Sequence, residues 1–352
     1  MNKINLAVLP GDGIGKEVMP ESLRVLDLLA EIHGGLKIER TIYPWNCDYY
    51  EEHGKMMPDH GYEQLRNHDA IFLGAMGDPA RVPDHIALWG TVINLRREFE
   101  QVINLRPVKS LKGVQSPLRS DVEFDFVVVR ENSEGEYSQV GGLIHQEADE
   151  IAIQTNVFTR KGTERAINYA FELAKTRNKK LTSATKSNGL YHSMPFWNRV
   201  FQEESKKYED IQTELIHIDA LSAFLVTKPQ SFDVIVASNL FGDILTDLGA
   251  AIMGSIGIAP AANLNLNGKY PSMFEPVHGS APDIYGKNIA NPVGQLWTGK
   301  LLLEHFGYQD LGELLLSTIE ELLVEGVKTP DLGGSYSTTE FSDALLERLA
   351  QK

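Results

Sequence analysis

The chain has 352 residues, a length typical of one large domain or two interleaved ones. Its 42% hydrophobic and 23% charged residues are typical of a soluble globular protein. With 33 Lys and Arg against 48 Asp and Glu, the net charge is −15, which disfavours nucleic acid and anionic membranes as partners. Any anion site must therefore be a local cluster of cations.

Cys47 is the only cysteine, so no intrachain disulfide can form and a reducing compartment is favoured. Residues 1–10 have the pattern of a strand rather than of a signal peptide. No apolar stretch approaches the roughly 18 residues of a membrane span. We therefore expect a cytoplasmic protein.

Strand and helix patterns alternate along most of the chain. In order, strands are expected at 4–9, 36–43, 70–73, 124–129, 181–185, 214–218 and 234–237, and helices at 15–32, 163–176, 194–208 and 244–253. This alternation predicts an α/β protein with largely parallel strand pairing.

Two regions interrupt the alternation. Residues 136–159 contain β-prone runs around Gly141 and Gly142, which predicts an antiparallel excursion that turns at the two glycines. Residues 256–292 are rich in Gly, Pro, Asn and Ser, which predicts long functional loops.

A glycine-rich turn at residues 10–15 follows the first strand and opens the first helix, as a dinucleotide-binding fingerprint does. Lys16 stands where the third glycine of that fingerprint belongs, and no acidic strand end follows at the usual distance. The sequence therefore argues against an ordinary Rossmann pyrophosphate loop. It favours a tight turn that lets the loop approach a ligand elsewhere.

Three arginines could together form the required cation cluster. Arg96 lies in a helical stretch, Arg106 just past its end, and Arg130 closes the strand at 124–129. Guanidinium groups bind carboxylates with two parallel hydrogen bonds, so converging arginines suit a dicarboxylate. Each alone is more often a solvated surface residue.

Asp243 and Asp247 are four residues apart, which places both carboxylates on one face of a helix with apolar surroundings. The bland interpretation is one capping and one solvated aspartate. The alternative is a divalent cation that bridges them, and all-oxygen ligation suits Mg²⁺ or Mn²⁺. Asp219, after the strand at 214–218, is a candidate third ligand.

Two further residues have proton-transfer chemistry. Lys186 follows the strand at 181–185, and beside a cation its ammonium would lose a proton more readily, as a general base requires. Tyr137 offers a phenol as a proton donor. The sequence alone places neither near the aspartates.

Taken together, residues 10–15, 104–107, 129–137, 185–189, 239–247, 275–284 and 291–292 resemble the β-decarboxylating dehydrogenases, the family of isopropylmalate, isocitrate and tartrate/D-malate dehydrogenases. The resemblance implies an isopropylmalate dehydrogenase-like fold, with two interleaved α/β domains around a continuous mixed sheet. Residues 1–101 and 257–352 would form the large nucleotide-binding domain. Residues 102–256 would form the substrate, metal and dimerisation domain, with a dimer arm near 136–159.

The resemblance also implies a role for each candidate. Arg96, Arg106 and Arg130 would hold the substrate carboxylates, and Asp219, Asp243 and Asp247 would hold Mn²⁺ or Mg²⁺. Lys186 would remove the hydroxyl proton while hydride leaves carbon 2, and Tyr137 would protonate carbon 3 after carbon dioxide departs. In this family the lysine and one metal aspartate, here Lys186 and Asp219, come from the other subunit, so a homodimer with shared active sites is expected. A monovalent-cation requirement is left open.

For the cofactor, the resemblance implies NAD bound by a loop rather than by the glycine turn. A carboxylate at Asp283 would accept hydrogen bonds from the adenosine ribose and repel the 2′-phosphate of NADP. The implied contact residues are Ile14, Glu275, His278, Gly279, Ser280, Ala281, Asp283, Ile284 and Asn291.

Residues 82–93 resemble tartrate and D-malate dehydrogenases at the segment where isopropylmalate enzymes carry the residues that surround the isopropyl group. The expected reaction is therefore oxidation and decarboxylation of D-malate to pyruvate, or oxidation of tartrate. Trp89 is the candidate that fills the isopropyl space, although the sequence does not show where its side chain points. A 3-isopropylmalate dehydrogenase and a non-catalytic regulatory subunit of the family are the alternatives.

Overall fold

The computed structural model describes residues 2–119, 122–145 and 149–352, and the contacts divide the chain into two compact units. The first unit comprises Met1–Gln101, Ser110–Ser120 and Ala250–Lys352, and the second comprises Val102–Lys109 and Asp121–Gly249. No helix in the described part of the chain is long and apolar enough to cross a membrane.

Five strands of the first unit follow one another in the order β2-β1-β3-β12-β11. All pair in parallel except β11, which is antiparallel to β12. Every residue of β3 is buried, as expected for a central strand covered on both faces. The strands are β1 Asn2–Gly11, β2 Leu36–Ile42, β3 Ala70–Ala75, β11 Pro260–Asn265 and β12 Ser272–Pro276.

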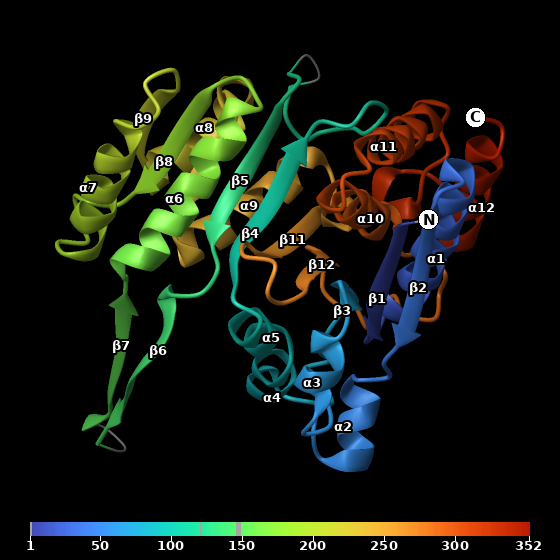
Figure 1. The fold of residues 1–352 in the computed structure, drawn as a ribbon, viewed down its shortest axis with the longest axis horizontal. Coiled ribbons are helices and arrows are strands. Elements are labelled where there is room, and N and C mark those ends of the chain that lie inside the picture. Colours follow the sequence, from blue (N-terminus) through green and yellow to red (C-terminus); the bar gives the residue numbers. More distant parts are fainter. Residues whose placement is uncertain (1, 120–121, 146–148) are drawn as a thin grey trace. The chain divides into compact units, whose positions relative to one another are not determined.

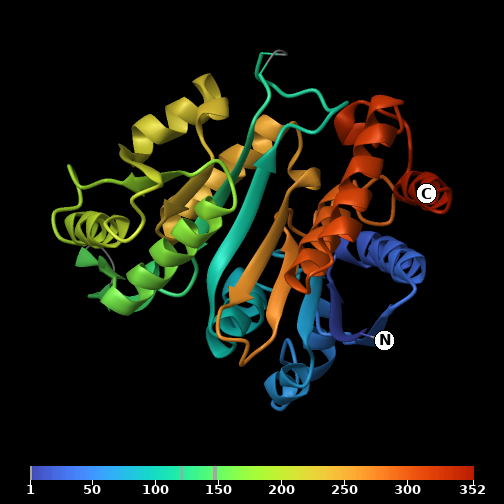
Figure 2. The same cartoon turned by 45° about the horizontal axis from the view of Figure 1, so that its top comes forward.

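Helices α1, α10, α11 and α12 of this unit pack against one another (Figure 2, blue and red). Helix α1 begins beside the glycine turn and ends at Gly34, whose positive φ of 68° stops the helix. Ser337 and Glu340 form a capping box that starts α12. The helices are α1 Gly15–His33, α2 Cys47–His53, α3 Gly61–Arg66, α4 Asp84–Gly90, α5 Val92–Glu98, α10 Val293–His305, α11 Gln309–Val324 and α12 Thr338–Leu349, with 3₁₀ turns at Ile256–Ile258 and Pro330–Leu332.

Five strands of the second unit follow the order β4-β5-β10-β8-β9, of which β4, β5, β8 and β9 are labelled in Figure 1. Strands β5, β10, β8 and β9 are parallel, and β4 is antiparallel to β5. The predicted α/β class with a mixed sheet is confirmed. The strands are β4 Gln101–Lys109, β5 Asp125–Glu131, β8 Lys180–Thr185, β9 Gln212–His217 and β10 Val234–Ala237.

Three of the four α-helices described in the second unit begin at a side-chain cap or directly after a strand. Thr159, for example, caps α6 by accepting a hydrogen bond from the Gly162 N–H. The helices are α6 Arg160–Lys175, α7 Ser193–Ser205, α8 Ile218–Thr227 and α9 Asn239–Met253, with a 3₁₀ turn at Pro229–Ser231.

Strands β6 Gly135–Ile144 and β7 Ile151–Val157 form a separate two-stranded antiparallel ribbon that extends away from α6 (Figure 1). The predicted excursion is present, but the turn predicted at Gly141 and Gly142 is wrong. Both glycines lie within β6, opposite Gln154 and Ile153. A Cβ on Gly141 would lie 2.0 Å from the Ile153 carbonyl oxygen, so this glycine allows close approach of the partner strand rather than a turn.

The prediction of loops throughout 256–292 is also wrong in part, because β11 and β12 lie there. Every residue of these two strands is buried. The Pro and Asn residues of these strands are typical of loops, but tertiary burial outweighs local propensity in a sheet.

Candidate active site

The candidate residues of the second unit lie at one edge of its sheet. Because β5, β10, β8 and β9 are parallel, their carboxyl ends share that edge, where α/β proteins bind ligands. Arg130 lies near the end of β5, and Asn239 follows β10. Lys186 follows β8, and Asp219 lies in the first turn of α8, directly after β9.

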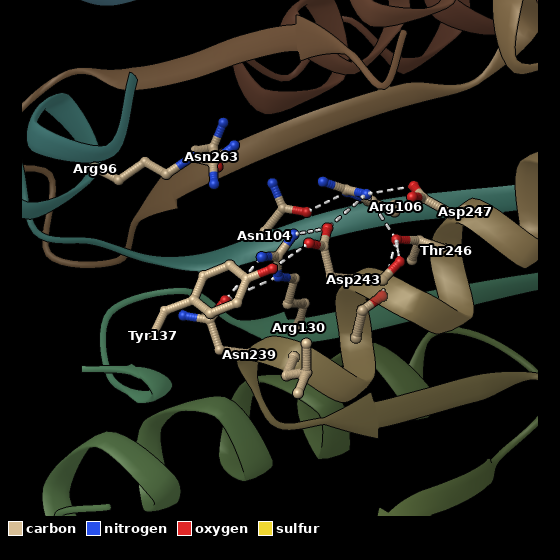
Figure 3. Close-up of polar contacts among 12 residues, drawn as sticks. Arg96, Asn104, Arg106, Arg130, Tyr137, Asn239, Asp243, Thr246, Asp247 and Asn263 are labelled. Atoms are coloured by element: carbon tan, nitrogen blue, oxygen red, sulfur yellow. Dashed lines mark hydrogen bonds and ion pairs between the residues drawn. The ribbon is translucent and has the colours of Figure 1, made fainter. Parts of the chain in front are cut away.

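A compact polar cluster joins five candidate side chains (Figure 3). The Tyr137 hydroxyl donates to Asp243 Oδ2 at 2.6 Å, and Arg130 Nη1 lies 2.5 Å from Asp243 Oδ1. Arg106 Nη1 lies 3.6 Å from Asp243 and 3.7 Å from Asp247. A phenol, two guanidinium groups and two carboxylates are thus brought together from β4, β5, β6 and α9.

Both arginines are held by neighbouring polar groups. Asn239 Oδ1 accepts from Arg130 Nε at 3.1 Å and from Nη2 at 2.8 Å. Arg106 donates to Asn104 Oδ1 at 2.6 Å and to Thr246 Oγ1 at 2.7 Å. The sequence predicted that Arg106 lies just past the end of a helix. The structure places it within β4 instead.

Helix α9 approaches Arg130 closely because residue 242 is a glycine. A Cβ on Gly242 would lie 2.6 Å from the Cβ and Cγ atoms of Arg130. Asp243 and Asp247 are one turn apart on this helix, as their spacing predicted, and both face Arg106.

Burial and the neighbouring carboxylate set the protonation of this cluster. Burial, together with the Asp243 carboxylate that accepts the phenol proton, raises the pKa of Tyr137 to about 12. Partial burial raises the pKa of Asp247, and Asp243 adds to this effect while Arg106 opposes it. The tyrosine is therefore a protonated donor at neutral pH.

Lys186 and Asp219 form a second group. Lys186 Nζ lies 3.1 Å from Asp219 Oδ2, and this hydrogen bond lowers the pKa of Asp219. Within residues 2–119, 122–145 and 149–352, no three His, Cys, Asp or Glu side chains of one chain could hold a metal ion together. The predicted triad of Asp219, Asp243 and Asp247 is thus not assembled within a single chain.

Arg96 belongs to the first unit, on α5. Its Nη2 donates to Glu275 Oε1 at 2.7 Å, and the same oxygen accepts from Asn263 Nδ2 at 2.7 Å. The Arg96 Nε is buried and has no hydrogen-bond partner among the described residues. Glu275, predicted as a cofactor contact, is therefore the ion-pair partner of this arginine.

The glycine turn packs on protein backbone. A Cβ on Gly11 would lie 1.6 Å from the Ala75 carbonyl oxygen, and one on Gly13 would lie 2.0 Å from that of Ser280. The Ile14 N–H donates to the same Ser280 oxygen at 2.8 Å. The turn thus supports the loop that follows β12 and does not cradle a pyrophosphate.

That loop carries the remaining predicted cofactor residues. Ile14 packs in one apolar cluster with Ala281 and Ile284. Asp283 and Gly279 are exposed. His278 is 6% exposed, and its buried Nε2 has no hydrogen-bond partner in the described part of the chain. Burial lowers the pKa of His278, so the ring is neutral. Its Nδ1 donates to the Gly279 carbonyl oxygen at 3.0 Å, which leaves Nε2 as a hydrogen-bond acceptor.

Two other predicted contacts of the loop are used internally. The Ser280 hydroxyl donates to the Gly77 carbonyl oxygen. Asn291 donates to Asp331 at 3.0 Å and accepts from the Val293 N–H at 3.0 Å, at the start of α10. These side chains therefore shape the loop.

Several residues of the cluster had no role assigned from the sequence. Asn104, Asn239 and Thr246 hold the arginines, although each lies inside or beside a motif that was recognised. Their position within those motifs was the signal that could have identified them from the sequence.

Trp89 is half-buried and stacks on the Arg97 guanidinium, with 5.1 Å from the ring centre to Cζ.

Similarity to known proteins extends over nearly the whole chain. The isocitrate/isopropylmalate dehydrogenase family matches residues 5–345. A probable tartrate dehydrogenase/decarboxylase of Bacillus subtilis (strain 168) is 59% identical, with 99% of each chain covered. The D-malate dehydrogenase [decarboxylating] of Escherichia coli (strain K12) is 52% identical, with 98% of each covered.

Among solved structures, an isocitrate dehydrogenase from Methylococcus capsulatus superposes with a TM-score of 0.88 at 32% identity, and 99% of each chain is covered. The predicted resemblance to tartrate and D-malate dehydrogenases is confirmed, and so is the expectation of a decarboxylating dehydrogenase. The chain belongs to the isocitrate/isopropylmalate dehydrogenase family.

Proposed function

We propose that the protein catalyses the NAD-dependent, divalent-metal-dependent oxidation and decarboxylation of a 2-hydroxy dicarboxylic acid, with D-malate or tartrate as the substrate. The observation that carries this proposal is the contact of Tyr137, Asp243 and the two arginines in one cluster. The names of the Bacillus and Escherichia relatives support the choice of substrate.

The substrate carboxylates are assigned to arginines. Arg106 and Arg130 reach the cluster from β4 and β5, and guanidinium groups match carboxylates with paired hydrogen bonds. The family resemblance adds Arg96 of the first unit. On this assignment the second unit is the substrate, metal and dimerisation domain, and the first is the nucleotide-binding domain.

The metal is assigned to Asp243 and Asp247, with Asp219 of a second copy of the chain as third ligand. The donor set fits Mg²⁺ or Mn²⁺, because two carboxylates one turn apart both lie within 3.7 Å of a single guanidinium nitrogen. The cation would supply Lewis-acid polarisation of the 2-hydroxyl and later of the ketone.

Proton transfer is assigned to Lys186 and Tyr137. Lys186 of the second copy takes the hydroxyl proton, while carbon 2 loses hydride to NAD. The bond from carbon 3 to its carboxylate then breaks, carbon dioxide leaves, and the electron pair stays with the substrate. Tyr137 donates its phenolic proton to carbon 3, which is consistent with a pKa near 12 that keeps the phenol protonated beforehand.

The adenosine half of NAD is assigned to the loop after β12. The buried, unpartnered Nε2 of His278 fits a hydrogen bond to the nucleotide, and the exposed Asp283 carboxylate fits the ribose hydroxyls. A carboxylate there would repel the 2′-phosphate of NADP.

A spectrophotometric screen tests the proposal. NAD reduction should be fastest with D-malate or a tartrate isomer, slower with 3-isopropylmalate and isocitrate, and accompanied by carbon dioxide release from D-malate. EDTA should abolish the activity, and Mn²⁺ or Mg²⁺ should restore it. A clear preference for 3-isopropylmalate would contradict the substrate assignment, and full activity in EDTA after dialysis would contradict the metal assignment.

A further inference from the structure

Residues 134–137, at the end of the β5–β6 connection and the start of β6, are attached to the N-terminal end of α9 at three points. The Asn239 side chain donates to the Glu134 carbonyl oxygen at 3.0 Å. The Glu136 carboxylate accepts two hydrogen bonds, and the Tyr137 hydroxyl donates to Asp243. The segment that carries the phenol and the helix that carries the aspartates are therefore held together.

Glu136 makes the central attachment. One carboxylate oxygen accepts from the Ser238 hydroxyl at 2.8 Å, and the other accepts from the Leu240 N–H at 3.1 Å. The Leu240 N–H lies in the first turn of α9, where backbone donors have no partner within the helix. A carboxylate at this end is also favoured by the helix dipole. With 9% of its surface exposed, Glu136 is shielded from competing water.

We propose that Glu136 is a positioning residue for the reaction: it fixes the start of α9 against β6, so that Tyr137 and Asp243 remain in contact. The inference rests on the proposed function, because it is that function which assigns Tyr137 and Asp243 to the same substrate. Without the carboxylate, the first turn of α9 loses two bonds to β6. The distance between proton donor and metal ligand is then no longer constrained at this point.

Glu134, two residues earlier, offers a matched control. Its carboxylate accepts from the Thr159 N–H at 2.7 Å and from the Thr159 hydroxyl at 2.9 Å. The chemistry is the same, a carboxylate bound to one N–H and one hydroxyl at the start of a helix, but the helix is α6. A loss that reflects only weaker helix capping should appear equally in both variants.

The experiment compares Glu136→Ala, Glu136→Gln, Ser238→Ala and Glu134→Ala in the full-length protein. Three quantities are measured: kcat and KM for D-malate, thermal stability, and Mn²⁺ affinity by electron paramagnetic resonance. Glu136→Ala should lower kcat or Mn²⁺ affinity by about 10- to 100-fold, the usual effect of removing a residue that orients metal ligands. Glu136→Gln should retain most activity, because an amide can bond both Leu240 and Ser238. Ser238→Ala removes one of the two bonds and should give a smaller loss, which keeps the test valid if Glu136→Ala does not fold.

A double-mutant cycle tests whether Glu136 affects catalysis through Tyr137. In a Tyr137→Phe background, Glu136→Ala should cost much less than in the wild type, since coupled residues are not additive. Equal losses of activity and Mn²⁺ affinity in the Glu134→Ala and Glu136→Ala variants, or full additivity with Tyr137→Phe, would overturn the inference. If the wild type oxidises no hydroxy acid, the proposed function fails, whereas the Mn²⁺ affinities still decide the role of Glu136. A wild type that binds no Mn²⁺ would overturn both.

Discussion

Arg130 is 1% exposed, and all three of its guanidinium nitrogens donate to Asn239 or Asp243. A buried cation of this kind is stable only when it is paired and hydrogen-bonded, because its removal from water is costly. At the scale of single residues, the site therefore consists of charged groups whose partners are already in place. Asp283, in contrast, is exposed and available to a ligand.

The exposed Asp283 makes cofactor choice testable at one residue pair. Replacing Asp283 with Lys and Ile284 with Tyr should shift preference toward NADP, because a repulsive charge is removed and an attractive one is added. Each 1.4 kcal/mol gained corresponds to about a tenfold change in relative affinity. The measurement is the ratio of kcat/KM for NADP to that for NAD.

Asp283→Asn is the control, since it removes the charge without adding a cation. It should raise the ratio less than the double variant does. A double variant that still ignores NADP would show that this loop does not select the cofactor.

At the scale of elements, the ribbon of β6 and β7 carries an apolar face. Val140, Ile144, Ile151 and Ile153 share one face by the alternation of the strands and their pairing, and each is between 45% and 51% exposed. Contiguous exposed apolar side chains mark interaction surfaces. We propose that a second copy of the chain covers this face, as expected for a dimer arm.

Placing carboxylates on that face should separate the subunits. The double variant Ile151→Glu, Ile153→Glu should be monomeric in analytical ultracentrifugation and lose NAD-dependent activity, because buried charges without partners oppose association. Thr213→Glu, which adds a charge at an exposed position of β9, should leave the dimer intact. An active dimeric double variant would show that the ribbon is not the interface.

At the scale of the whole molecule, the chain carries two separate sets of site residues. Lys186 and Asp219 are bound to each other, whereas Tyr137, Arg106, Arg130, Asp243 and Asp247 form the other set. If the first set completes the site of a second copy, one subunit must donate both Lys186 and Asp219.

This arrangement makes a definite prediction for mixed dimers. Lys186→Met and Asp243→Asn should each be nearly inactive alone. The first removes the proposed general base, which typically contributes about 10²–10⁴-fold, and the second removes a proposed metal ligand. After subunit exchange, activity should recover, because the mixed dimer holds one site with both native residues. Recovery is measured as NAD reduction with D-malate.

A second mixture serves as the control. Lys186→Met exchanged with Asp219→Asn should not recover, because both residues come from the same subunit and every site then lacks one of them. Recovery in this control, or none in the first mixture, would contradict a shared site.

Seven strands and four helices could be predicted from the sequence, because hydrophobic periodicity is local, whereas β4 and the helices α10, α11 and α12 were not predicted. The strand Val234–Ala237 was predicted to the residue, and the spacing of Asp243 and Asp247 placed both on one face of a helix. The strands β11 and β12 were missed, since their Pro and Asn residues are typical of loops. The glycine pair in β6 was misplaced because its role depends on the opposing strand.

The sequence by itself determined the family and the types of the site residues, because chemistry depends on side-chain identity and the motifs are long. Only the tertiary structure decided which of them meet. Parallel pairing of β5, β10, β8 and β9 brings residues more than 100 positions apart to one edge, so that Tyr137 contacts Asp243. The tertiary structure also decided that Lys186 binds Asp219 and that Glu136 holds the start of α9. These contacts depend on the three-dimensional path of the backbone rather than on local sequence pattern.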